Sequence, residues 1–160
     1  MFKKTNNIIL IFFLFVISSS LVFAFIIQYG LGHQPCKLCI YQRVPYIISI
    51  FLIIELIFLK KNEKTTLLLL SLIFIISVIL AFYHFGIEQG FFTESFVCES
   101  ASFSETLTKD QLLEQLKQSP ISCKDVSFKF LGLSLASINV IFSLALSVIF
   151  VRLFLNYGKN

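Results

Sequence analysis

The chain has 160 residues, of which 57% are hydrophobic and only 14% are charged, and 20 of them are phenylalanines. Soluble domains carry roughly 25% charged residues, so this composition excludes an ordinary soluble domain and predicts an integral membrane protein. The net charge of +4 is unevenly distributed along the chain, and no basic surface typical of a nucleic-acid-binding protein accompanies it.

The first apolar run covers residues 8–27 without a charge. Its length matches the roughly 20 residues that a helix rising about 1.5 Å per residue needs to cross the hydrocarbon core. A cleaved signal peptide is the alternative, because Lys3 and Lys4 precede the run and small residues occur between Ser20 and Ala24. We favour a membrane span, since the run is longer than the roughly 7–15 residues of a signal-peptide core.

A loop is predicted at residues 28–39, because two glycines and Pro35 interrupt the apolar pattern there. This loop ends in a Cys-x-x-Cys pair, Cys36 and Cys39. A helix N-terminus and a nearby cation both stabilise a thiolate, the form that undergoes exchange. Arg43 follows Cys39 at the spacing that places two side chains on one face of a helix. We predict a reactive pair; the alternative is a static disulfide beside an arginine that extends to the lipid headgroups.

Three further spans are predicted from uncharged or nearly uncharged apolar runs. They cover residues 40–59, 65–85 and 130–151, and a short lysine-rich segment joins the first two. The whole chain, residues 1–160, is therefore expected to form one domain. The fold class that we predict is an all-α membrane protein, built as a bundle of four transmembrane helices.

The segment between the third and fourth spans, residues 86–129, lacks an apolar run. It holds seven acidic and four basic side chains, as a solvent-side loop would. Within it, Thr108 and Gln111 form a helix-capping pattern, and three leucines share one face of the helix that would follow. We therefore predict a short amphipathic helix in this loop, lying along the membrane surface or against the bundle.

The positions of the basic residues predict how the spans are oriented. Basic side chains gather on one side of the four-span topology, and all four cysteines fall on the other side. The positive-inside tendency makes the first side cytoplasmic. Both termini are therefore expected in the cytoplasm of a bacterium, and both cysteine-bearing loops in the periplasm, where disulfides persist. The basic residues in question are Lys3, Lys4, Lys60, Lys61, Lys64, Arg152 and Lys159.

A second cysteine pair, Cys98 and Cys123, lies in the long outer loop. Two pairs on one side suggest a relay that passes electrons from one loop to the other by thiol–disulfide exchange. The alternative for this pair alone is a structural disulfide, which could stabilise the fold by roughly 3 kcal/mol. The oxidising location and the unequal spacings disfavour a zinc site made of the four cysteines, so we expect no metal ligand.

The residues around Arg43 predict a binding site for a flat, lipid-soluble oxidant. A fixed cation at the headgroup level suits a molecule whose carbonyl oxygens gain negative charge on reduction, which describes a quinone. Gln42 and Tyr46 are adjacent on the same side, and His84 lies at the matching end of the third span. We expect these side chains to contact the quinone; for His84 the alternative is an interfacial hydrogen bond. Asn139, in the last span, is expected to bond to a neighbouring helix.

The motif Cys-x-x-Cys-Ile-Tyr-x-Arg runs from Cys36 to Arg43, and Phe-Leu-Gly-Leu opens the last span at residues 130–133. With four spans and a cysteine pair in the second outer loop, the chain resembles the disulfide bond formation protein B (DsbB) family. Members of this family are membrane quinone reductases that reoxidise the periplasmic dithiol oxidase DsbA. The related vitamin K epoxide reductases carry their Cys-x-x-Cys in the last helix, whereas here it comes early.

The resemblance implies a quinone-dependent thiol oxidoreductase of the bacterial inner membrane. The soluble thioredoxin-fold partner would attack Cys98, and Cys123 would then exchange with Cys36. Cys39 would pass the electrons to ubiquinone or menaquinone, assisted by Arg43. A different class remains open, namely a non-catalytic membrane protein or transporter subunit in which both disulfides are static.

Overall fold

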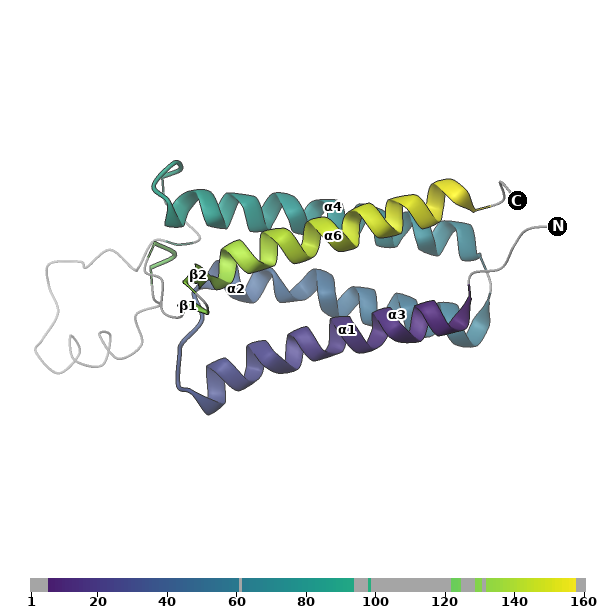
Figure 1. Ribbon diagram of the computed structural model, residues 1–160, viewed down its shortest axis with the longest axis horizontal. Helices are drawn as coiled ribbons and strands as arrows, with labels where there is room; N and C mark the ends of the chain where they lie inside the picture. The colour runs from purple at the N-terminus through teal and green to yellow at the C-terminus, as the bar shows by residue number, and fades with distance from the viewer. Residues whose placement is uncertain are drawn as a thin grey trace, which may run out of the picture.

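The computed structural model describes residues 6–60, 62–93, 98, 122–124, 129–130 and 132–157. Within them it has four long helices, which lie side by side along the long axis of the molecule (Figure 1). Each is long and apolar enough to cross a membrane, which confirms the predicted four-helix membrane bundle. They are α1 (Asn7–Phe25), continued by the π-helical turn η1 (Ile26–Gly30); α3 (Arg43–Leu59), preceded by the short α2 (Lys37–Tyr41); α4 (Glu63–Glu88); and α6 (Leu135–Asn156).

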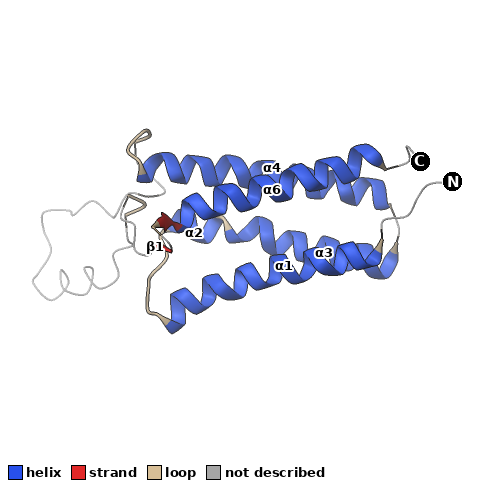
Figure 2. Cartoon of the chain, viewed as in Figure 1, coloured by secondary structure: helices blue, strands red, loops and turns tan. Residues whose placement is uncertain are grey.

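The two ends of the bundle differ in what they carry. The start of α1 and the end of α6 lie at one end, where α3 also turns into α4 (Figure 1). At the other end lie α2 and two short strands, β1 (Lys129–Phe130) and β2 (Leu133–Ser134), which form the only sheet in the described part of the chain (Figure 2). Because α2 begins directly after Cys36, the cysteine pair lies at the end opposite the termini.

The last helix begins at Leu135, whereas the sequence predicted a span from residue 130. β1 and β2 pair antiparallel, and Gly132 in the turn between them has a φ of +82°. That left-handed conformation cannot continue a right-handed helix. Ser134 then caps α6, because its hydroxyl accepts a hydrogen bond from the backbone N–H of Ser137 at 3.1 Å.

The second span is divided into two helices. α2 ends at Tyr41, Gln42 lies in a turn, and α3 begins at Arg43. Pro45 has no backbone N–H, so it cannot donate to the carbonyl of Tyr41 and the helical hydrogen-bond ladder is interrupted there. The predicted span from residue 40 is therefore preceded by a separate short helix, and the end of the predicted loop 28–39 becomes α2, which contains Cys39 and has Cys36 as its N-cap residue.

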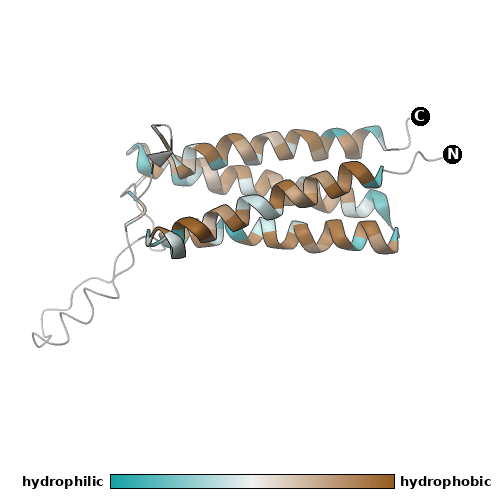
Figure 3. Ribbon diagram, turned by 60° about the horizontal axis from the view of Figure 1, so that its bottom comes forward, coloured by the Kyte–Doolittle hydropathy of each residue, from teal (hydrophilic) through white to brown (hydrophobic). Residues whose placement is uncertain are grey.

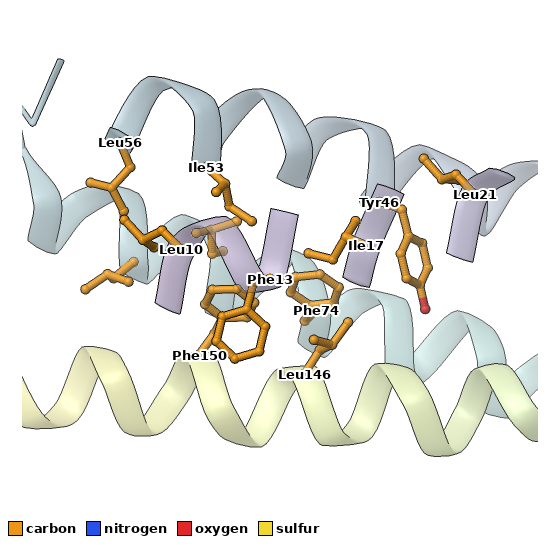
Figure 4. Packing of buried hydrophobic residues seen from close by; sticks show 12 residues of the cluster. Leu10, Phe13, Ile17, Leu21, Tyr46, Ile53, Leu56, Phe74, Leu146 and Phe150 are labelled. Atoms are coloured by element: carbon orange, nitrogen blue, oxygen red, sulfur yellow. The ribbon is translucent and has the colours of Figure 1, made fainter. Parts of the chain in front are cut away.

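The centre of the bundle is packed with aromatic and aliphatic side chains from all four long helices (Figure 4). The ring centroids of Phe74 and Phe150 are 5.3 Å apart, and Phe13 lies 5.2 Å from Phe150. Hydrophobic residues also cover the outer faces of the helices along their length (Figure 3). Apolar residues on the outer faces are suited to contact with lipid. Inside a lipid bilayer, helices associate mainly through close packing of side chains, as in the centre of this bundle.

Some predictions concern residues that the structure does not describe. The amphipathic helix expected near Thr108 lies outside the described residues. So do Lys3, Lys4, Lys61 and Lys159, on which part of the orientation argument rests.

Candidate functional site

The Cys-x-x-Cys pair lies at the start of α2, and both cysteines are free thiols. The sulfur atoms of Cys36 and Cys39 are 2.8 Å apart. Cys36 is the N-cap residue of α2, and its sulfur accepts a hydrogen bond from the backbone N–H of Cys39 at 3.3 Å. The same sulfur lies 3.5 Å from Nε2 of His84, which comes from α4.

These contacts favour the thiolate form of Cys36. The hydrogen bond from the Cys39 side chain contributes most to lowering the pKa of the Cys36 thiol to about 5; burial acts against this shift, and the hydrogen bond from His84 adds to it. A thiol with so low a pKa is largely ionised at neutral pH and is a good participant in exchange. The predicted reactivity of the pair therefore has a local structural basis.

The second predicted pair, Cys98 and Cys123, forms a disulfide whose two residues are both buried. These cysteines belong to one buried cluster with Cys36, Leu38 and Ile87, and Cys39 packs against that cluster. The fold thus brings all four cysteines together although they come from two separate loops. Thiol–disulfide exchange requires direct approach of sulfur atoms, and this cluster places the two pairs as neighbours.

A cavity of about 270 Å³ lies beside the pair and is lined by residues of α1, η1, α2, α3, α4 and α6 and of the segment between η1 and α2. The four predicted ligand-binding residues, Arg43, Gln42, Tyr46 and His84, all line it, and so does Cys39. Cys36 is not among its lining residues; it faces the buried cluster instead. Much of the remaining wall is apolar and includes Leu21, Phe23, Ala24, Ile27, Ile138 and Phe142.

Arg43 is half-buried, and two residues from the first span hold its guanidinium group. Its Nη1 donates a hydrogen bond to Oε1 of Gln28 at 2.6 Å, and its Cζ lies 4.9 Å from the ring centroid of Phe25. A cation over an aromatic face is attracted by the ring quadrupole. The charge that the sequence predicted is therefore fixed at the cavity, although the sequence did not predict either partner, because both lie in a different helix.

A buried hydrogen-bond network surrounds Gln42. Its Nε2 lies 3.2 Å from Nδ1 of His84 and donates to the backbone carbonyl of Leu80, also at 3.2 Å. Nδ2 of Asn139 donates to Oε1 of Gln42 at 2.9 Å, and the hydroxyl of Tyr46 donates to Oδ1 of Asn139 at 2.6 Å. The prediction that Asn139 bonds to a neighbouring helix is confirmed.

Glu88 belongs to the site, although the sequence placed it among the solvated acids of the outer loop. It lies in the last turn of α4, and its side chain is only 6% exposed. One carboxylate oxygen accepts a hydrogen bond from the hydroxyl of Ser134 at 2.5 Å, and the other lies 3.9 Å from Nε2 of His84. The helix continues beyond the predicted end at residue 85, so a loop acid became a buried neighbour of the cysteine pair.

Cys36, Cys39 and His84 also resemble part of a metal-binding set, since their donor atoms all lie within 4.8 Å of one another. Two thiolates on one tetrahedral zinc ion, each about 2.3 Å from the metal, would be roughly 3.8 Å apart. The two sulfurs here are 2.8 Å apart, much closer than that. This geometry suits a pair that interconverts between dithiol and disulfide better than a pair of zinc ligands.

Comparison with known proteins gives one consistent result. The family model described as "Disulfide bond formation protein DsbB" matches residues 6–153. An uncharacterized protein of Rickettsia prowazekii, RP370, is 30% identical over 159 residues, covering 98% of this chain and 90% of that protein. Proteins named "Disulfide bond formation protein B" from Xylella fastidiosa and Histophilus somni are each 26% identical; they cover 81% and 88% of this chain, and the matches span 78% and 80% of those proteins.

Proposed function

Because the chain belongs to the DsbB family of membrane disulfide bond formation proteins, we propose that it oxidises the dithiol of a soluble DsbA-type partner with a thioredoxin fold. The electrons pass to a membrane quinone, either ubiquinone or menaquinone. The protein acts in the bacterial inner membrane, with both termini in the cytoplasm and both cysteine-bearing loops in the periplasm. The positive-inside distribution of its basic residues supports this orientation.

One observation carries this proposal: the two cysteines of the pair face different surroundings. Cys36 lies in the buried cluster with the Cys98–Cys123 disulfide, whereas Cys39 lines the cavity that also contains Arg43. Electrons can therefore enter the pair at Cys36 and leave it at Cys39. A static disulfide needs neither a neighbouring pair of free thiols nor a cavity beside one of them.

The exchange steps balance without any further oxidant. A thiolate of the partner attacks Cys98, breaks its bond to Cys123 and releases the Cys123 thiolate. That thiolate attacks Cys36 of the oxidised pair and releases the Cys39 thiolate. The second thiol of the partner then resolves the mixed disulfide, and the released Cys98 thiolate attacks Cys123 and frees Cys36. The partner has become a disulfide, and Cys36 and Cys39 have become the free thiols that the structure shows beside a closed Cys98–Cys123 bond.

The residues of the cavity fit a quinone headgroup. The volume of the cavity, about 270 Å³, is close to the lower end of the roughly 300–1,000 Å³ typical of small-molecule sites. A cavity of this size suits a quinone ring whose tail extends into lipid. When bound, a quinone would supply the two-electron oxidant that returns Cys36 and Cys39 to a disulfide. Arg43 would stabilise negative charge there, and Gln42, Tyr46 and His84 would contribute polar contacts.

A purified assay tests the proposal against the static-disulfide alternative. Detergent-solubilised protein is mixed with a reduced thioredoxin-fold partner and a short-chain ubiquinone, and quinone absorbance is followed. We expect many turnovers, with one quinone reduced per partner disulfide formed. The matched control is the same partner with its reactive cysteine changed to serine, which should give no reaction. If the reduced wild-type partner remained reduced and quinone absorbance did not change, both with the ubiquinone and with a short-chain menaquinone in its place, the proposal would be wrong.

A further inference from the structure

The network around Gln42 determines where His84 carries its proton. The Leu80 carbonyl is a backbone oxygen and can only accept a hydrogen bond. The Gln42 atom 3.2 Å from it must therefore be the amide nitrogen, because the opposite orientation would place two oxygens against each other. That same nitrogen lies 3.2 Å from Nδ1 of His84, so Nδ1 is the acceptor in this contact.

The other side of the network is satisfied by the orientation that the Leu80 carbonyl sets for Gln42. With the nitrogen of Gln42 at Leu80, its Oε1 faces Asn139. The amide nitrogen of Asn139 therefore donates a hydrogen bond to this Oε1 at 2.9 Å. Oδ1 of Asn139 is then free to accept the hydroxyl of Tyr46 at 2.6 Å. Each of these donors meets an acceptor, so the backbone carbonyl of α4 excludes the flipped amide and Asn139 of α6 completes the orientation that remains.

The opposite edge of the His84 ring faces acceptors. Nε2 lies 3.5 Å from Sγ of Cys36 and 3.9 Å from Oε1 of Glu88, and both partners accept a proton donor when they are ionised. A neutral imidazole has one donor and one acceptor nitrogen. Since Nδ1 accepts from Gln42, the proton lies on Nε2 and points to the cysteine.

We propose that Gln42 and Asn139 are positioning residues that hold His84 as the neutral Nε2–H tautomer, so that His84 donates a hydrogen bond to the Cys36 thiolate. An imidazolium would need a proton on Nδ1 as well, and the amide group of Gln42 occupies that direction with a donor. The Cys36 thiolate is therefore stabilised by a neutral donor and not by an ion pair with His84. The inference rests on the proposed function in treating Cys36 as a reacting thiol.

Several titratable groups lie near His84 and influence where its proton is held. Cys36, the N-cap residue of α2, and Cys39, within α2, lie on one side, and Glu88 lies one turn further along α4. From α3, Tyr46 bonds to Asn139 and not to the ring, while Arg43 lines the same cavity and is held by Gln28. From α6, the contact runs through the neutral Asn139. The experiment therefore has to report the tautomer directly as well as its effect on Cys36.

Nitrogen NMR of the protein labelled with ¹⁵N-histidine reports the tautomer, and the chain has only two histidines. The signals of His84 are identified by their loss in His84→Asn. We expect an unprotonated Nδ1 and a protonated Nε2 in the wild-type protein at neutral pH. Asn139→Asp keeps the shape of the side chain but removes the donor to Gln42, so it should release Gln42 and give a mixture of tautomers.

The reactivity of Cys36 gives the second readout. In a Cys39→Ser background with the Cys98–Cys123 disulfide intact, Cys36 is the only free thiol, and its alkylation rate is measured against pH. Asn139→Asp and Asn139→Leu should raise the pH midpoint of alkylation by about one unit, equivalent to a ~10-fold smaller thiolate fraction below that midpoint. Ser143→Ala is the matched control, because Ser143 lies one turn further along α6 and, among the described residues, its hydroxyl bonds to the backbone carbonyls of Asn139 and Val140 and to no side chain.

An Nδ1–H tautomer in the wild-type protein would overturn the inference. So would an unchanged His84 spectrum and an unchanged Cys36 midpoint in Asn139→Asp, the variant that best preserves packing. Neither measurement uses a partner protein or a quinone. The inference can therefore fail while the turnover assay succeeds, and the reverse outcome is equally recognisable.

Discussion

Replacing Cys39 by serine should abolish multiple turnover with quinone, with a loss of at least about 10³-fold, as expected when an essential nucleophile is removed. Among the described cysteines, Cys39 is the one that lines the cavity, and a serine hydroxyl cannot be oxidised to a disulfide. The Cys98–Cys123 disulfide lies outside the cavity and should still react with the partner. We therefore expect at most one equivalent of partner to be oxidised per protein, measured by thiol titration alongside quinone absorbance.

Two further variants separate the steps of the relay. Cys36→Ser should also stop turnover, because Cys36 is the member of the pair that lies in the cluster with Cys98 and Cys123. Cys98→Ser should additionally prevent the mixed disulfide with a partner that lacks its resolving cysteine, as seen on non-reducing gels. Sustained quinone reduction by Cys39→Ser would contradict the assigned exit of electrons, and a mixed disulfide at Cys123 in place of Cys98 would reverse the assigned entry.

Replacing Arg43 by alanine should raise the apparent KM for quinone by roughly 10- to 100-fold, since a hydrogen bond to a charged group contributes about 1.5–3 kcal/mol. Arg43 is the cation that lines the cavity in the described part of the chain, and Gln28 and Phe25 fix its position. Initial rates against quinone concentration, at saturating partner, measure this effect. The KM for the partner dithiol should not change, because Arg43 lies on the cavity side of the pair.

Two controls show whether charge or position matters at residue 43. Arg43→Lys keeps the charge but loses the planar fork of donors, so its KM should fall between those of the wild-type and alanine variants. Gln28→Ala keeps the arginine and removes the 2.6 Å bond that orients it, so its effect should be smaller than that of Arg43→Ala. Unchanged quinone kinetics in Arg43→Ala would remove the residue from the site.

The four helices were predictable because long apolar runs report the thickness of a bilayer directly. The division of the second span into α2 and α3 was not predicted, because the interruption of the hydrogen-bond ladder at Pro45 lies inside a continuing apolar run. The late start of α6 depends on a hairpin around Gly132, and a two-residue strand has almost no pattern of its own. The predicted helix boundaries were therefore wrong where a local turn interrupts a run of apolar residues that continues in the sequence.

The site residues were predictable where their chemistry is distinctive. The two cysteine pairs stand out in the predicted loops, and Arg43 stands out as a cation near the start of an apolar run; all of them reach the site. Glu88 did not stand out, because the sequence placed it within a loop with many acids, and only the last turn of α4 shows that it is buried beside His84. The bond between Gln42 and Asn139 joins residues far apart in the chain, and the sequence predicted that Asn139 bonds between helices without indicating its partner.

The redox state of the four cysteines in membranes with and without quinone tests the central claim most directly. Membranes from cells unable to make quinone are treated with a thiol reagent of high mass, before and after a short-chain quinone is added. The account predicts that thiols at Cys36 and Cys39 accumulate without quinone and disappear when it is supplied, while the partner changes from dithiol to disulfide. Cysteines whose labelling is the same under both conditions would contradict it and would favour a protein with static disulfides.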